Sequence, residues 1–469
     1  MDQGKSLLKN TVIYAIGELG SKVLAFLLLP LYSFYLSAPE FGTYDLIIAS
    51  VTLLIPFITI QSSDSIYRWL LDAKAERKSI TITTGFFIII IVSLVFCAIY
   101  YISYIFIDYK YGNYIFFLLL FSAYLPCFQQ ILRGLGKNKL YATAGIFNTI
   151  ILFSLNILLL VVFKLGLKSL FIASITANIL TIIFICIVTK LGRFISIKNI
   201  NLQEAKKMIA YSWPLIPNSI SWWLINIADK YLILYILNIE ANGLYAVSSR
   251  FPAIITVFNS IFLMAWQDHG IIADNEDNQV FFSKTLDKFI NFEFTLVILL
   301  ISISQFVIKH FISYKFFEAY KYMPMLYIGV AYAALSAYLG VGYQRAKATK
   351  DIFKTTMIGG VINICTSIFL MRYIGLYAPA LGTFLSFSTI YLIRKHQTNQ
   401  FFSIKVNNKK LILLTCIALI YPIQYYLSNV FQLLFFTCAL MLFAVLNKDL
   451  FAYFLTMLKE RRVVKVNSL

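Results

Sequence analysis

Three basic side chains, Lys22, Lys230 and Arg250, lie inside long apolar stretches of the sequence. A charge at the centre of a bilayer costs roughly 2.5–3.5 kcal/mol on insertion scales, so a charge that remains there usually faces a protein interior or a wet cavity. Lysine and arginine in such positions can bind an anionic ligand. Arg68, at the end of another apolar stretch, is a fourth candidate, although a charge that only sets the orientation of the chain would also explain it.

Two acidic side chains accompany these cations. Glu18 precedes Lys22 by four residues, which is the favourable order for an ion pair along a helix. The pair could simply make both charges tolerable, or Glu18 could tune a lysine that faces a cavity. Asp229 is adjacent to Lys230, and because neighbouring side chains on a helix point about 100° apart, these two pair poorly. Arg250 could pair with Asp229 instead, or line a cavity itself.

The segment 211–237 is expected to position Asp229 and Lys230 on a membrane-spanning helix. Pro214 and Pro217 lie near its start, where proline can begin or kink a span. At about 100° per residue, the polar side chains of this helix share one third of its surface, and its aliphatic side chains lie opposite. One face therefore suits water and charge. The residues on that face are Asn218, Trp222, Asn226, Asp229 and Lys230.

Composition assigns the chain to the membrane proteins. Hydrophobic residues make up 60% of the sequence and charged residues only 13%, whereas soluble domains carry about 25% charged residues. The net charge of +19 is spread over short loops and not over one soluble face, which argues against a nucleic-acid partner. The six cysteines all lie in apolar segments and the three histidines are far apart. No disulfide framework, metal site or cofactor is therefore expected.

Several sequence motifs of enzymes are missing from the chain. A G-x-x-x-x-G-K-[ST] loop does not occur, so ATP hydrolysis is not expected. H-E-x-x-H and G-x-S-x-G do not occur either. We therefore expect no catalytic residue, and we interpret the chain as a transporter and not an enzyme.

About 20 apolar residues are needed to cross a bilayer as a helix. This length predicts an all-α, polytopic membrane protein with 12–14 transmembrane helices, the lower number omitting the last pair of segments. The predicted spans are 11–36, 44–66, 82–107, 113–133, 142–164, 167–189, 211–237, 244–267, 289–311, 322–343, 353–373, 376–396, 411–427 and 430–454.

Most of the 40 Lys and Arg residues fall in the loops on the same side of these spans as the N-terminus. Cytoplasmic loops carry such an excess, so both termini are expected in the cytoplasm. Lys309, Lys315 and Lys321 cluster in one outer loop and are the main exception.

The two halves of the chain carry a weak repeat. Leu36–Tyr44 aligns without gaps on Leu237–Tyr245 and shares Leu, Gly and Tyr with it, and Gly166-Leu167 and Gly375-Leu376 open the sixth and twelfth spans. A glycine in each exit loop is expected to permit the tight turn between neighbouring spans. Transporters with parallel repeats place their substrate site between the halves. The predicted division is 1–205, an N-terminal six-helix bundle; 206–400, a C-terminal six-helix bundle; and 401–469, two additional helices with a basic cytoplasmic tail.

Short motifs in both halves resemble those of a known family. Over roughly residues 5–400, the chain is similar to polysaccharide translocases of the multidrug/oligosaccharidyl-lipid/polysaccharide exporter superfamily. The motifs are N-T-x-x-Y (10–14), P-L-Y (30–32), L-S-A-P-E-F-G-T-Y-D (36–45), A-D-K-Y (228–231) and G-L-Y-A-V-S-S-R (243–250).

This resemblance implies two six-helix bundles around a central cavity and alternating access. The implied substrate is an undecaprenyl-pyrophosphate-linked oligosaccharide, flipped to the outer leaflet of the bacterial inner membrane for O-antigen, lipopolysaccharide or a related surface polysaccharide. Partners would be this lipid-linked oligosaccharide, membrane lipid and other polysaccharide-assembly proteins. The candidate substrate-binding residues are Lys22, Lys230, Arg250 and Arg68, with Glu18 and Asp229 as charge partners or ion-coupling groups.

One departure from the family pattern is that family members often carry arginine in the cavity, where this chain has Lys22 and Lys230. Lysine binds phosphate as a point charge without the two-pronged geometry of arginine. The two lysines could therefore bind pyrophosphate more weakly than arginine would, or they could contact an acidic sugar instead.

Two other functions are compatible with a polytopic membrane protein. A cation or drug antiporter of the same superfamily would be expected to carry acidic residues in its cavity, whereas the charges within these spans are mostly basic. A membrane polysaccharide polymerase or glycosyltransferase would be expected to carry a large outer loop with catalytic charges, and the outer loops here are short.

Overall fold

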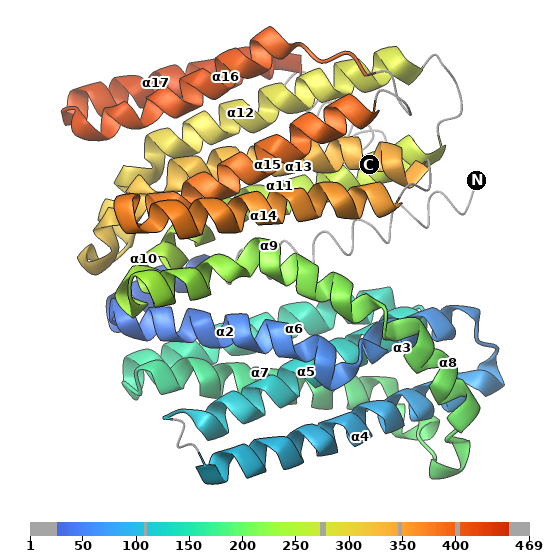
Figure 1. Ribbon diagram of the computed structural model, residues 1–469. Helices are drawn as coiled ribbons and strands as arrows, with labels where there is room; N and C mark the ends of the chain where they lie inside the picture. Colours follow the sequence, from blue (N-terminus) through green and yellow to red (C-terminus); the bar gives the residue numbers. More distant parts are fainter. Residues whose placement is uncertain (1–25, 107–109, 273–277, 346–348, 399–403, 450–469) are drawn as a thin grey trace, which may run out of the picture. The chain divides into compact units, whose positions relative to one another are not determined.

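The computed structural model describes residues 26–106, 110–272, 278–345, 349–398 and 404–449. Within these ranges, all regular secondary structure is helical (Figure 1). Nine of the described helices are long and apolar enough to cross a membrane by length and composition. The predicted all-α membrane fold is confirmed.

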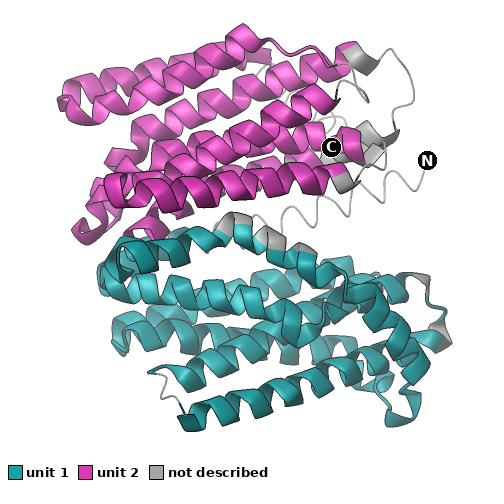
Figure 2. Cartoon of the chain, in the orientation of Figure 1, with its two compact units in different colours: residues 1–243 teal, residues 244–469 magenta. Residues whose placement is uncertain are grey.

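The chain forms two compact units, residues 1–243 and 244–469 (Figure 2). The first unit begins, within the described residues, with a short apolar helix, Phe26–Tyr35. Its further helices are α2 (Ala38–Thr59), α3 (Ser62–Asp72), α4 (Ala75–Phe106), α5 (Gly112–Gly134), α6 (Asn138–Ile157), α7 (Leu167–Thr189), α8 (Leu202–Ser212), α9 (Leu215–Ile236) and the start of α10 (Ile239–Arg250).

The boundary between the compact units lies after α9, whereas the repeat in the sequence placed it at residue 205. Helix α8 packs against α3 and α4, and α9 packs against α2. Packing therefore joins the seventh predicted span to the first unit, although the repeat pattern assigns it to the second half.

The second unit is built around α13 (Met323–Arg345). Tyr327, Tyr338 and Tyr343 of this helix are fully buried, and Trp266 stacks on Tyr338 with ring centroids 4.0 Å apart. Neighbouring helices α11, α12, α14 and α15 pack against α13, and the last pair, α16 and α17, packs against α12. Their bounds are α11 Pro252–Ile272, α12 Asn278–Phe311, α14 Thr349–Ile374, α15 Tyr377–Thr398, α16 Asn408–Ile420 and α17 Asn429–Leu446.

Three of the predicted spans are interrupted helices. The span 44–66 breaks between α2 and α3, where Ile60 and Gln61 adopt φ angles of 47° and 52°, a backbone region that side chains rarely enter. The other two breaks lie between α8 and α9 and between α10 and α11. Pro214 and Pro252 lie at these two breaks. A proline is favoured in the first turn of a helix, where its missing N–H group costs no hydrogen bond.

The glycines of the repeat have two different roles. Gly166 and Gly375 both have φ 57° and turn the chain immediately before α7 and α15, as expected for a glycine in a left-handed turn. The turn role predicted for Gly42 and Gly243 is wrong, because both residues lie inside helices, α2 and α10. A Cβ atom on Gly42 would lie 2.3 Å from the carbonyl oxygen of Ile239, so these glycines allow two helix backbones to touch.

Candidate functional site

Lys230 forms an ion pair with an acid that the sequence analysis did not consider. Its Nζ lies 2.7 Å from Oδ2 of Asp45 on α2, and the exposed fraction of the side chain is 18% for Lys230 and 2% for Asp45. The pair joins the last third of α9 to the first half of α2 inside an apolar unit. A buried charge of this kind is tolerable because its partner is held at bonding distance.

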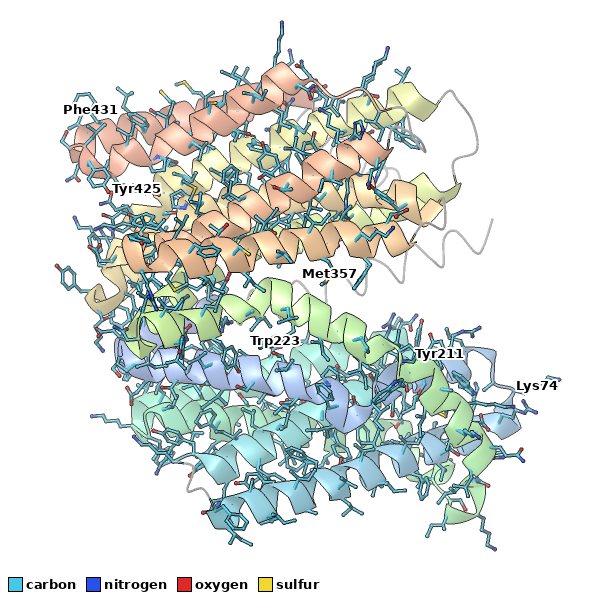
Figure 3. All side chains as sticks on the ribbon, viewed as in Figure 1. Lys74, Tyr211, Trp223, Met357, Tyr425 and Phe431 are labelled. Carbon is cyan, nitrogen blue, oxygen red and sulfur yellow. The ribbon has the colours of Figure 1, made fainter. Side chains whose placement is uncertain are left out.

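The ion pair belongs to a row of polar contacts that joins α2 and the residues just after it to α9 and the start of α10, which we call the α2–α9 seam. Trp223 (labelled in Figure 3) donates its indole N–H to the carbonyl oxygen of Ala49 at 2.8 Å. Asn242, at the start of α10, donates its amide to the carbonyl oxygen of Gly42 at 3.0 Å. Further members of the seam are the hydrogen-bonded pairs Tyr231–Ser50 and Gln61–Ser219.

Of the residues predicted for the polar face of this helix, the seam contains Lys230. The side chains of Asn218, Trp222 and Asn226 lie outside the described part of the structure. Ser219, Trp223 and Lys230 recur at helical spacing and therefore share one side of α9. That side packs on α2. Part of the polar face of α9 is thus satisfied by protein and not by water.

The other predicted site residues have separate positions. Glu18 and Lys22 lie outside the described residues. Asp229 is buried on α9, and Arg250 is an exposed residue at the end of α10. The pairing of Asp229 with Arg250 stays a prediction.

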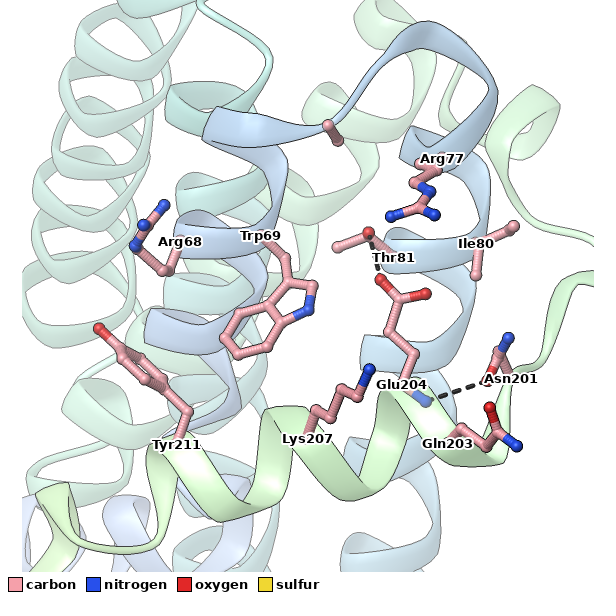
Figure 4. Close-up of a pocket in the computed structure, with 11 residues that line it drawn as sticks. Arg68, Trp69, Arg77, Ile80, Thr81, Asn201, Gln203, Glu204, Lys207 and Tyr211 are labelled. Atoms are coloured by element: carbon pink, nitrogen blue, oxygen red, sulfur yellow. Dashed lines mark hydrogen bonds between the residues drawn. The ribbon is translucent and has the colours of Figure 1, made fainter.

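Arg68 lines a pocket of about 660 Å³ in the first unit, which we call the basic pocket (Figure 4). Its walls come from α3, from the first turns of α4, and from α8 with the residue before it. Three cations, Arg68, Arg77 and Lys207, line it together with one acid, Glu204. The remaining lining residues are Trp69, Ala73, Ile80, Thr81, Asn201, Gln203 and Tyr211.

The acid of the basic pocket is held in place by neutral partners. Thr81 donates its hydroxyl to Oε1 of Glu204 at 3.2 Å, and the backbone N–H of Glu204 is capped by the side chain of Asn201 at 3.0 Å. Within the described part of the chain, neither Arg77 nor Lys207 forms a side-chain hydrogen bond or an ion pair. The pocket therefore offers cationic groups to an anion.

One residue of the α2–α9 seam, Asp45, could have been found in the sequence. Asp45 is a charged residue at the start of the uncharged, apolar stretch 46–60. A charge next to or inside a predicted span is the same signal that identified Lys230. The grouping of Lys207 with Arg68 and Arg77 has no comparable signal, because Lys207 lies in a different basic loop of the sequence, 130 residues after Arg77.

Solved structures with the same fold cover nearly the whole chain. The structure of the lipid II flippase MurJ in an inward closed conformation has a TM-score of 0.69 and 15% sequence identity, and the match covers 94% of this chain and 100% of that chain. An inward-facing multidrug resistance MATE family transporter of the MOP superfamily has a TM-score of 0.66 and 13% identity, covering 81% and 95%. A MOP superfamily transporter from Pyrococcus furiosus has a TM-score of 0.60 and 14% identity, covering 86% and 97%.

A family model described as "Polysaccharide biosynthesis protein" matches residues 7–267. These residues make up more than half of the chain and include the basic pocket and the α2–α9 seam. No curated protein sequence matches the chain significantly.

Proposed function

Because the chain belongs to the polysaccharide biosynthesis protein family, we propose that it is a flippase for a lipid-linked oligosaccharide. The substrate is an undecaprenyl-pyrophosphate-linked unit of O-antigen or a related surface polysaccharide. The protein carries it from the inner to the outer leaflet of the bacterial cytoplasmic membrane by alternating access.

The observation that carries this proposal is the fold likeness to the lipid II flippase over 94% of this chain and 100% of that one. Lipid II flippase is a name that itself describes movement of a lipid between leaflets. The family match adds polysaccharide biosynthesis. Taken together, a flippase fold and a polysaccharide family favour a sugar-bearing lipid as the substrate.

The distribution of charge supports an anionic substrate. Lys22, Lys230 and Arg250 lie in predicted spans, and Arg68 lies in the basic pocket. We propose these four residues as contacts for the pyrophosphate or for an acidic sugar. Glu18 and Asp229 are the acids that we propose to exchange a coupling ion.

The test uses purified full-length protein in liposomes that carry imposed proton and sodium gradients and contain a polyprenyl-pyrophosphoryl oligosaccharide with a fluorescent group on the sugar. Dithionite reduces only the fluorophores of the outer leaflet. Empty liposomes should lose about half of the signal, because about half of the lipid faces outward, and liposomes with the protein should lose nearly all of it. Equal loss from both preparations, together with a normal polysaccharide ladder in cells that lack the gene and any other flippase, contradicts the proposal.

A second candidate function is drug or cation antiport, which the likeness to the multidrug resistance MATE family transporter favours. The discriminating measurement is drug susceptibility in an efflux-deficient strain. Antiport predicts that expression of the protein protects this strain while leaving the surface polysaccharide unchanged. A flippase changes the polysaccharide and leaves drug susceptibility unchanged.

A further inference from the structure

We propose that the basic pocket of the first unit receives the phosphate-bearing headgroup of a membrane lipid at the cytoplasmic face. The residues of the pocket are the reason for proposing a lipid phosphate as its ligand. That this lipid is also the transported one rests on the proposed function. The site precedes translocation, because the pocket lies at the end of the unit that carries the cytoplasmic loops in the predicted topology.

The first argument is the convergence of charge from three separate helices. Arg68 comes from α3, Arg77 from α4 and Lys207 from α8. In Figure 4 Arg77 and Lys207 reach from opposite walls toward the carboxylate of Glu204, and Arg68 lies on the other side of Trp69. Three cations and one acid, Glu204, leave the pocket lining with a net positive charge, so a bound anion would reduce the repulsion among the cations. Arginine binds phosphate with two parallel hydrogen bonds, since the phosphate oxygens match the planar fork of the guanidinium.

The second argument is that neighbouring groups hold the pocket wall in place. The segment before α8 is tied to α4: Ser79 and Thr83 donate their hydroxyls to the carbonyl oxygen of Phe194 at 2.6 and 3.0 Å. The backbone N–H of Asn201 is bonded to the hydroxyl of Thr84 at 3.1 Å. A binding site whose wall is fixed before the ligand arrives loses less conformational entropy when it binds.

The third argument is the surface beside the pocket, which identifies the ligand as a lipid. Ile197, Leu202 and Trp213 expose 86%, 70% and 61% of their surface, although the opposite side of α8 is buried through Ala205 and Met208. Basic residues alternate with these apolar ones. They are Arg193, Lys198, Lys206 and Lys207. A basic amphipathic segment of this kind lies in the membrane interface among lipid headgroups.

The fourth argument concerns the aromatic wall. Trp69 and Tyr211 contact each other edge to face, with ring centroids 5.4 Å apart, and both line the pocket. Tryptophan and tyrosine are favoured at the boundary between lipid and water, because each has an apolar ring and a polar tip. The wall therefore suits the region where a lipid phosphate joins its apolar chain.

The experiment measures binding to the purified full-length protein in nanodiscs of neutral phosphatidylcholine. Three probes are added separately: undecaprenyl pyrophosphate, phosphatidylglycerol and inorganic pyrophosphate. The single variants Arg68→Gln, Arg77→Gln and Lys207→Gln should each weaken binding of the preferred probe by about tenfold or more, equivalent to about 1.4 kcal/mol. Lys139→Gln is the matched control, because Lys139 is an exposed lysine in the first turn of α6 that does not line the pocket, and it should bind as the wild type does.

The probes distinguish the possible sources of the phosphate. Selective binding of undecaprenyl pyrophosphate supports a reception site for the transported lipid. Equal binding of phosphatidylglycerol supports the same headgroup chemistry with bulk anionic lipid as the occupant. Binding of all three probes that is unchanged in the three Gln variants overturns the proposal.

Two further measurements separate misfolding and the wider function from the inference. Arg68→Lys and Arg77→Lys keep the charge and should recover part of the binding lost in the Gln variants. If they bind as poorly as the Gln variants while remaining monodisperse, charge is not what the pocket contributes, and the proposal fails. The dithionite assay tests flipping independently of binding. If the wild type flips the lipid and the pocket variants both flip and bind it normally, only the inference about the pocket is refuted. If binding depends on the pocket but the protein flips no lipid, only the proposed function is refuted.

Discussion

Replacing Lys230 by methionine tests whether the ion pair with Asp45 holds the first unit together. Methionine keeps most of the length of the lysine side chain and removes its charge. The carboxylate of Asp45 then loses its cation in a site where only 2% of its surface is exposed. Removing one partner of a buried ion pair typically costs 3–5 kcal/mol, about the full desolvation penalty of the remaining charge.

The expected change in melting temperature follows from the size of the unit. For a unit of 150–250 residues, each kcal/mol lowers the melting temperature by about 2–4 °C, and the first unit spans residues 1–243. Lys230→Met should therefore melt about 6–20 °C below the wild type. Fluorescence-detected size exclusion after heating in detergent measures this shift without the need for activity.

The double variant Asp45→Asn/Lys230→Met is the control for the charge argument. It removes both charges and should melt closer to the wild type than Lys230→Met does, because a buried neutral amide has a smaller desolvation penalty than a buried unpaired carboxylate. The double variant also separates structure from substrate binding. If Lys230 only stabilises the fold, the double variant should export polysaccharide, and if Lys230 also contacts the substrate, it should be abundant in the membrane but inactive. A wild-type melting temperature for Lys230→Met alone would refute the reasoning.

Three further predictions follow. Gly243→Ala should destabilise the first unit by about 1–3 kcal/mol, because its Cβ would lie 2.0 Å from the carbonyl oxygen of Ala38, whereas Gly192→Ala has nothing within 4 Å of the added Cβ and should melt as the wild type does. Single cysteines at Ser313 and at Ser468, in a background without native cysteines, should label differently with an impermeant thiol reagent on intact cells, since the positive-inside pattern puts them on opposite sides; equal labelling would contradict that topology. Flipping in liposomes should need no ATP and should stop when the proton or sodium gradient is collapsed. Glu18→Gln or Asp229→Gln should remove this dependence on the gradient. Flipping that required ATP would contradict coupling to an ion gradient.

The membrane-protein class and the positions of many of the helices could be predicted from the sequence alone. A bilayer provides no water to bond exposed backbone groups, so a long apolar run must form a helix. Segment 167–189 therefore corresponds residue for residue to α7. The family resemblance, too, rested on local motifs, and the match over residues 7–267 confirms it.

The partners of individual residues were decided only by the tertiary structure. Helical periodicity shows which side chains share a face, but it does not show which distant helix that face meets. Lys230 therefore had two possible roles in the sequence, and only the packing of α9 on α2 brings it to Asp45. For the same reason, Gly42 was interpreted as a turn residue, although it allows α2 to touch α10. Arg68, Arg77 and Lys207 each occupy a basic loop in the sequence, and they form one pocket because α3, α4 and α8 pack together.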